Sequence, residues 1–276
     1  MQGTIITRFY WKSTAFIMVV WRYRGLISSL VWREFQSRYL NSLLGSIWSI
    51  LHPVAMVSVY TLIFSTIMRA RLEGVDDTLA FGVFLCAGLF TWGYFSELLS
   101  RCPSLFIDQS NFLKKVNFPR IILPIVVLLS ATINFSIIFG VFIIFLTITG
   151  RFPGFAIFAF IPLLMIQQGF AIGLGMILGT LNVFFRDIGH FINIILQFWF
   201  WLTPIVYPMT ILPENIRRLL SLNPMTNLIA AYQNIILYGQ WPHWEQYRYH
   251  IAAAIITIVL GYMVFKALAD DIVDEL

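Results

Sequence analysis

Long stretches without any acidic or basic residue limit what this chain can fold into. Residues 43–68, 121–150 and 152–185 contain no Asp, Glu, Lys or Arg. At about 1.5 Å per helical residue, each stretch exceeds the roughly 30 Å hydrocarbon core of a bilayer. Only 11% of the 276 residues are charged and 59% are hydrophobic, whereas soluble domains carry about a quarter charged residues. The sequence therefore predicts an all-α integral membrane protein.

Six transmembrane helices are expected in a single transmembrane domain that occupies the whole chain. The predicted spans cover residues 43–68, 79–96, 121–150, the segment from Pro162 to 185, 188–203 and 251–265. The domain divides into a leader with an interface helix (1–44), spans one to five (45–205), a re-entrant gate segment (206–247), the sixth span (248–268) and a tail (269–276).

The stretch from 181 to 208 organises the second half of the chain. Two apolar arms meet at Arg186 and Asp187, which predicts a hairpin between spans. The second arm ends at Pro204 and Pro208, and the later segment 219–244 is uncharged but interrupted around Asn223. Irregular backbone at membrane depth is tolerated only where protein or a water-filled cavity satisfies it. We therefore expect re-entrant helices that border a pathway.

The leader predicts an amphipathic helix in the membrane interface. Leu26, Leu30 and Val31, together with neighbouring aromatic residues, are spaced to form an apolar face opposite a basic one. A leader that anchors by charge alone is the alternative. With the N-terminus inside, twelve basic residues fall on the cytoplasmic side and six outside, which predicts that both termini are cytoplasmic.

Other functional classes find little support in the sequence. The net charge of +5 comes from basic residues that flank apolar runs, which is typical of topogenic charge and not of nucleic-acid binding. Cys86 and Cys102 have no metal-ligand neighbours, so no metal site is expected. Gly169, Gly173, Gly175 and Gly179 form two Gly-x-x-x-Gly spacings, which predict close helix packing.

Five sequence blocks resemble, in order, the signatures of polysaccharide-type ABC exporter permeases. They are WREFQSRYLNSLLGSIWSILHP (32–53), FLKKVNFPRIILP (112–124), LNVFFRDIGH (181–190), FWFWLTPIVYP (198–208) and LNPMT (222–226). The resemblance is closest to permeases for lipid-linked O-antigen, and capsule and teichoic-acid permeases share much of it. It implies a homodimer paired with two copies of a separate ATPase subunit. ATP and Mg²⁺ would bind to that subunit, and no cofactor is expected on this chain, which has no Walker A sequence.

The resemblance also implies which residues touch the ATPase. The leader helix and the loop from 108 to 115 would contact the ATPase and receive its motion. The turn at 186–187 would lie on the same cytoplasmic side. It would either take part in coupling or serve only as a polar turn between spans. The predicted coupling residues are Arg33, Arg38, Tyr39, Asp108, Lys114, Lys115, Arg186 and Asp187.

Aromatic residues and helix breaks after the fifth span are the candidates for the conduit and its external gate. The four consecutive aromatics at 198–201 point all round a helix, so they cannot all face one path. Aromatic faces stack on sugar rings, but Trp and Tyr also favour the headgroup level, which leaves an interfacial belt as an equal alternative. The predicted conduit and gate residues are Phe198, Trp199, Trp201, Pro204, Tyr207, Pro208, Asn223, Pro224 and Tyr232.

The expected function is ATP-driven export of an undecaprenyl-diphosphate-linked polysaccharide, with O-antigen the first candidate, across a bacterial inner membrane. The carrier's diphosphate would meet Arg22, Arg24, Arg33 and Arg38 on the leader helix. A capsule or teichoic-acid permease and a small-molecule drug exporter are alternatives within transporters. A membrane-embedded transferase or hydrolase is the alternative from another class. It would need converging acid, base or metal ligands, whereas His52, His190, His243 and His250 are scattered.

Overall fold

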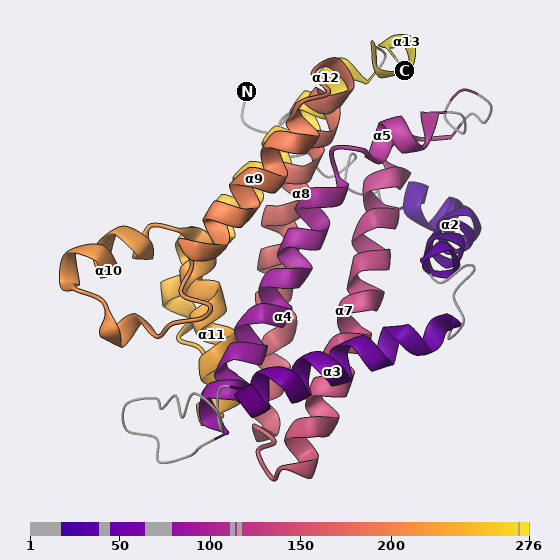
Figure 1. Ribbon diagram of the computed structural model, residues 1–276. Coiled ribbons are helices and arrows are strands. Elements are labelled where there is room, and N and C mark those ends of the chain that lie inside the picture. Colours follow the sequence, from indigo (N-terminus) through magenta and orange to yellow (C-terminus); the bar gives the residue numbers. More distant parts are fainter. Residues whose placement is uncertain are drawn as a thin grey trace.

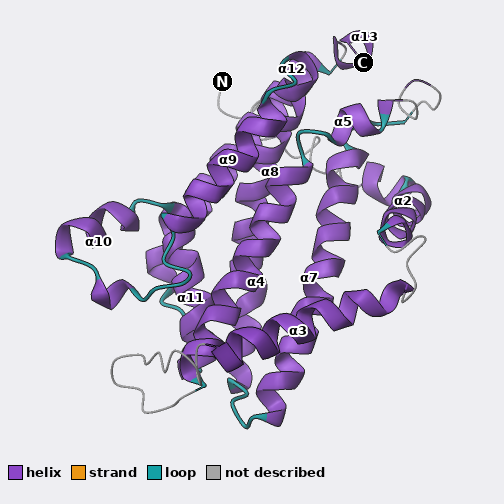
Figure 2. Ribbon diagram, viewed as in Figure 1, coloured by secondary structure: helices purple, strands orange, loops and turns teal. Residues whose placement is uncertain are grey.

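Helices joined by short loops make up the described part of the protein (Figure 2). The computed structural model describes residues 18–38, 45–63, 79–110, 114, 118–269 and 271–275. Within these ranges there is no β-strand. The predicted all-α class is therefore confirmed.

Within the described residues, four helices are long and apolar enough to cross a bilayer. They are α4 (Ala80–Arg101), α7 (Ile122–Ile148), α8 (Phe160–Phe184) and α12 (Arg248–Leu268), the last two extended by the 3₁₀ turns Gly154–Ala159 and Trp244–Tyr247. α4 is the most deeply buried of the four and contacts both α7 and α8, and α12 packs along α8 (Figure 1). These helices confirm four of the predicted spans and make the chain a multi-pass membrane protein.

Two further apolar helices are short within the described residues. α3 (Trp48–Leu62) has 15 residues and α9 (Ile188–Trp201) has 14, so each extends about 21–23 Å at 1.5 Å per residue. Part of the predicted first span, at 43–44 and 64–68, lies outside the described residues. Pro53 lies within α3. The described part thus contains four full-length spans and two shorter apolar helices, and the prediction of six spans stays open.

The segment between α9 and α12 contains two further helices. α10 (Glu214–Ser221) projects to one side of the bundle (Figure 1), whereas α11 (Pro224–Tyr238) packs against α4 and is largely buried. The predicted break at Asn223 and Pro224 is the start of α11, because the Asn223 side chain accepts a hydrogen bond from the Met225 amide and Pro224 occupies the first turn. α11 then continues unbroken until Gly239, whose φ of 61° ends it.

The predicted interface helix is present as α2 (Arg24–Ser37), which lies against α7. Its buried residues are Ile27, Leu30 and Val31. The aromatic Trp32 is 60% exposed and stacks on Phe35 with ring centroids 6.0 Å apart. Aliphatic side chains thus bind α2 to the bundle, and a Trp on the outside suits the headgroup region.

Glycines of α8 allow two close approaches, as the Gly-x-x-x-Gly spacing predicts. A Cβ added at Gly173 would overlap the backbone of Thr257 in α12, and one at Gly261 would overlap the carbonyl oxygen of Gly173. On another part of α8, a Cβ at Gly175 or Gly179 would overlap Cys102, which follows α4. α8 is therefore packed by glycines against both α12 and the end of α4.

Replacing Gly261 with valine should force α12 away from α8. Overpacking of this kind costs about 1–3 kcal/mol, so we expect a clear fall in the thermal unfolding temperature of the detergent-solubilised protein. Gly140→Val in α7 is the matched control, because a Cβ at Gly140 meets no atom within 4 Å. Equal unfolding temperatures for the two variants would contradict the glycine-mediated packing.

Candidate functional site

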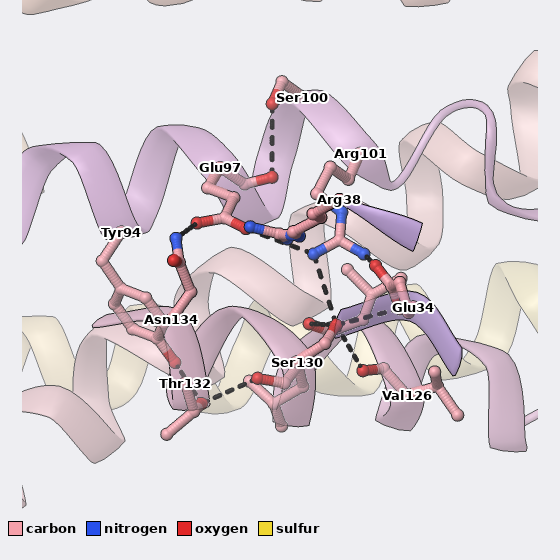
Figure 3. Close-up of polar contacts among 12 residues, drawn as sticks. Glu34, Arg38, Tyr94, Glu97, Ser100, Arg101, Val126, Ser130, Thr132 and Asn134 are labelled. Atoms are coloured by element: carbon pink, nitrogen blue, oxygen red, sulfur yellow. Dashed lines mark hydrogen bonds and ion pairs between the residues drawn. The ribbon is translucent and has the colours of Figure 1, made fainter. Parts of the chain in front are cut away.

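Two acidic and two basic side chains from α2 and α4 meet beside α7. Glu34 lies on α2 and Arg38 follows it by one turn as the C-cap residue, while Glu97 and Arg101 lie one turn apart on α4. The ion pairs form between the helices, Glu34 with Arg101 and Arg38 with Glu97, and Figure 3 shows the four side chains converging. Arg101 Nη1 also lies 3.3 Å from Glu97 Oε1. We refer to these four residues as the charge cluster.

The helix α7 completes the charge cluster with two uncharged polar residues. Ser130 Oγ donates to Glu34 Oε2 at 3.0 Å and accepts from Arg101 Nη1 at 3.3 Å. Asn134 Nδ2 donates to Glu97 Oε2 at 2.8 Å. The cluster thus joins the interface helix to two membrane spans.

Burial makes the charge cluster sensitive to the loss of any member. The four charged side chains are between 20% and 29% exposed, and charges within a membrane domain are costly unless paired. Two cations and two anions balance each other here. Removing one partner of a well-shielded pair leaves an uncompensated charge, which costs more than the intact pair contributes.

A cleft of about 270 Å³ opens beside the charge cluster. Its polar rim includes Arg33 Nη2, 3.5 Å from Gln109 Oε1, and Asp108 Oδ2, which accepts from Ser104 Oγ at 2.6 Å. We call it the interface cleft. It is lined by Leu30, Arg33, Glu34, Arg101, Ser104, Leu105, Asp108, Gln109, Leu123, Val126 and Val127.

One asparagine ties two of the predicted coupling segments together. Asn182 Nδ2 donates to the carbonyl of Pro103, just before the short helix α5 (Leu105–Asp108), at 2.9 Å. Asn182 Oδ1 accepts from the Gly189 amide, just after the turn at 186–187, at 2.8 Å. The structure therefore places the segment that carries Asp108 and the turn that carries Arg186 and Asp187 at one end of the bundle.

The other predicted coupling residues are only partly described. Arg186, Asp187 and Lys114 are exposed. Tyr39 and Lys115 lie outside the described residues.

The four predicted diphosphate-binding arginines occupy different environments. Arg33 is exposed and lines the interface cleft, while Arg38 is paired with Glu97. Arg22 and Arg24 are exposed at the other end of the helix, where Arg24 lies 4.8 Å from the centre of the Trp21 ring. Only Arg33 combines an exposed guanidinium with a cleft.

The predicted conduit aromatics divide between two sides of α9. Phe198 and Trp201 are 64% and 59% exposed. Trp199 points inward, packs against Phe95 with ring centroids 5.2 Å apart, and donates from Nε1 to Asn223 Oδ1 at 2.8 Å. The four aromatics therefore do not share one face, as their consecutive positions predict.

The predicted gate residues form local contacts after α9. The Tyr207 hydroxyl donates to the carbonyl of Trp201 at 2.7 Å, and Asn223 Nδ2 donates to Thr203 Oγ1 at 3.0 Å. Pro204 is buried, and Pro208 and Pro224 are half-buried. Asn223 thus links the end of α9 to the start of α11.

Tyr232 occupies the protein core in this conformation. It is 0% exposed, and its hydroxyl donates to Gln167 Oε1 of α8 at 2.8 Å. Its ring also packs against Phe160, with centroids 4.8 Å apart. These contacts show a packing role, and a part in an external gate stays a prediction.

Residue-by-residue reasoning predicts only Arg38 of the four residues in the charge cluster. Glu34, Glu97 and Arg101 are not among the predicted site residues, and neither are Ser130 and Asn134 of α7. One signal was available, because Glu34–Arg38 and Glu97–Arg101 have the same acidic-to-basic spacing of four residues. Among the described residues, no three His, Cys, Asp or Glu side chains come together in a way that could hold a metal ion.

Comparisons with known proteins cover most of the chain. A sequence profile of the family described as ABC-2 type transporter matches residues 25–237. The O-antigen export system permease protein RfbA of Myxococcus xanthus is 32% identical over 259 residues, which are 93% of this chain and 97% of that protein. A protein of the same name from Klebsiella pneumoniae is 29% identical over 86% of this chain and 89% of its own length. The polysialic acid transport protein KpsM of Escherichia coli is 22% identical over 87% of this chain and 92% of its own length.

A double-mutant cycle should reveal coupling within the charge cluster. Arg38→Gln and Glu97→Gln should each lower the free energy of unfolding, and together they should lose less than the sum, with a coupling energy of about 1–3 kcal/mol. Unfolding of the protein in nanodiscs would measure it. Arg22 is exposed, precedes α2 and lies outside the charge cluster, so Arg22→Gln is the control. It should change the free energy of unfolding by less than about 0.5 kcal/mol. If the changes in unfolding free energy of the two single variants add exactly in the double variant, the ion pair between Arg38 and Glu97 contributes nothing to stability.

Proposed function

The chain belongs to the ABC-2 type transporter family, and on that premise we propose that it is the membrane subunit of an ATP-driven exporter of a lipid-linked polysaccharide. The observation that carries this proposal is the similarity, over nearly the full length of both chains, to permeases named for O-antigen export. Those relatives are more similar to this chain than the polysialic acid transport proteins are. O-antigen linked to undecaprenyl diphosphate is therefore the favoured cargo.

ATP hydrolysis belongs to a separate partner in this proposal. The chain has no Walker A sequence, so it lacks the glycine-rich loop that would hold the nucleotide phosphates. A homodimer of this chain would associate with two ATPase subunits, which bind ATP and Mg²⁺. This chain would convert their closure into helix movement.

The arrangement of helices supports a route for that conversion. The segment that carries Asp108 contacts α8 at Gly179 and α12 through stacked rings of Phe106 and Phe265, 5.8 Å apart. It also follows directly after α4, whose last turn carries Arg101. Movement of this segment would reach the charge cluster and two other spans.

The orientation that fits this route has both termini in the cytoplasm of a bacterium and the chain in its inner membrane. α5 and the C-terminal helix α13 (Asp271–Glu275) lie near the same end of the bundle (Figure 1). The excess of basic residues on the cytoplasmic side supports the same assignment. The end of the bundle that carries α5 would then face the ATPase.

The interface cleft is the proposed place of access for the lipid carrier. Its lining combines the exposed Arg33 with apolar side chains such as Leu30 and Leu123. A diphosphate would bind to Arg33 by charge-assisted hydrogen bonds while the polyprenyl chain remains in lipid. Arg22 and Arg24 would contribute longer-range attraction, and Arg38 would contribute only after release from Glu97.

Asp108→Ala and Lys114→Ala should uncouple the transporter. We expect the tagged chain to co-purify with an ATPase subunit in equal amount, and lipid-linked polysaccharide to stimulate hydrolysis several-fold. The two variants should retain the ATPase but lose the stimulation, as measured by phosphate release. Glu214→Ala, an exposed acidic residue on α10, is the control and should behave as wild type. A chain that purifies alone and supports no hydrolysis would overturn the proposed function.

Arg33→Gln should weaken recognition of the carrier. Losing one charge-assisted contact of about 1.5 kcal/mol or more should raise the lipid-linked polysaccharide concentration for half-maximal ATPase stimulation about tenfold. Arg218→Gln, at an exposed arginine of α10, should leave that concentration unchanged. An unchanged concentration for Arg33→Gln would exclude the interface cleft as the access site.

A further inference from the structure

A second cleft lies between three helices, on the other side of Glu97. It has a volume of about 180 Å³, below the range of about 300–1,000 Å³ that is usual for drug-sized ligands. We call it the intramembrane cleft. It is lined by His52, Pro53 and Met56 of α3, Leu89, Phe90, Gly93, Tyr94 and Glu97 of α4, and Asn134, Phe135 and Ile138 of α7.

One polar residue of this cleft, Asn134, lies near the middle of a membrane span. Asn134 is the thirteenth of the 27 residues of α7, which places it about 18 Å along the helix axis from the first residue. Polar and ionisable groups at such depth are costly and usually mark a functional site. The charge cluster satisfies only part of their hydrogen-bonding capacity.

Unused acceptor positions remain on the cleft wall. Glu97 Oε1 accepts from Arg38 and Arg101, while Glu97 Oε2 accepts only from Asn134 among the described residues. Asn134 Oδ1 accepts no hydrogen bond from the part of the chain that the structure describes. A carboxylate and an amide oxygen can each accept two bonds. A ligand that carries several hydroxyl groups would use these positions.

Aromatic rings form another part of the wall. Tyr94 and Phe135 pack together with ring centroids 4.9 Å apart, and Phe90 also lines the cleft. Aromatic faces offer a large apolar surface beside the polar groups. One sugar ring presents hydroxyl groups at its edge and C–H groups on its faces, so it matches both parts of this wall.

Charge selects among sugars. Glu97 is the one formally charged residue among the described residues that line the cleft, apart from any protonation of His52. An acidic sugar or a phosphate would find no Lys or Arg side chain among the described residues of that wall, because Arg38 and Arg101 are engaged in ion pairs with Glu97 and Glu34. We propose that the intramembrane cleft binds a single neutral sugar unit of the exported polysaccharide; this inference rests on the proposed function.

Photo-crosslinking in living cells would test the occupant directly. A photoreactive amino acid would replace Ile138, which lines the cleft, or Ile144, which lies on the same helix and is 61% exposed. In cells that make a neutral polysaccharide, illumination should attach glycan to position 138 at least tenfold more than to position 144. Antibody against the polysaccharide would detect the adduct after the chain is purified.

A pair of glycine variants would test whether the crosslinking at position 138 depends on the cleft. Added Cβ atoms at Gly93 and at Gly140 both meet open space, but only Gly93 lines the cleft. Gly93→Trp should therefore fill the cleft and reduce the glycan adduct at position 138 at least tenfold, while Gly140→Trp should leave it unchanged. Unfolding temperatures of both variants should match the parent and exclude a folding defect.

The possible results distinguish a failure of the sugar site from a failure of the proposed function. Phospholipid adducts alone at position 138, in cells whose export is intact, would overturn the sugar site and leave the exporter standing. Equal glycan adducts in cells that make a uronic-acid polysaccharide would overturn the selection for neutral sugars. Absence of export in cells that contain the wild-type chain and its ATPase would overturn the proposed function and the cleft's role together.

Discussion

The pairing of charges between α2 and α4 determines how the interface helix sits on this protein. Four ionised side chains could not remain poorly hydrated beside membrane spans unless each met an opposite charge or a polar group. Because Glu34 and Arg38 bind across to Arg101 and Glu97, rotation or sliding of α2 would separate both pairs together. The buried aliphatic residues Ile27, Leu30 and Val31 hold the same helix without such directional demands. Charge therefore specifies the position of α2, and apolar contact provides general adhesion.

The packing of α8 against α12 and the end of α4 depends on glycines, which have no side chain. Lipid tails are as apolar as leucine, so close contact between spans must come from van der Waals packing. Gly173 and Gly261 allow α8 and α12 to approach closely, and Gly175 and Gly179 seat the end of α4. Asn182 then fixes the same corner to the turn after α8 by two hydrogen bonds. Glycine packing and this asparagine thus hold α8 against α12 and against the end of α4.

Much of this architecture could be predicted from local sequence, and the pairing across helices could not. Uncharged runs predict spans because the bilayer imposes a length and excludes charge, and the glycine spacing of α8 predicts its close contacts. The partner of Glu34 is different, since 67 positions separate it from Arg101 and spacing gives no information about such a contact. Likewise, Asn223 and Pro224 resemble a helix break, whereas the same two residues form a favourable helix start. Tyr232 was a candidate for the gate by its position, but its burial depends on Gln167 and Phe160, which lie far away in the sequence.

The shortness of α9 has a consequence for the lipid around it. A helix of 14 residues extends about 21 Å, roughly 9 Å less than the hydrocarbon thickness. Where its exposed Phe198 and Trp201 meet lipid, the acyl chains must shorten or the headgroups and water must move inward, at a cost of fractions of a kcal/mol per Å. A membrane thinned in this way is a smaller barrier to any polar polymer. The protein would therefore lower the free energy needed for translocation by thinning the surrounding bilayer as well as by offering a path.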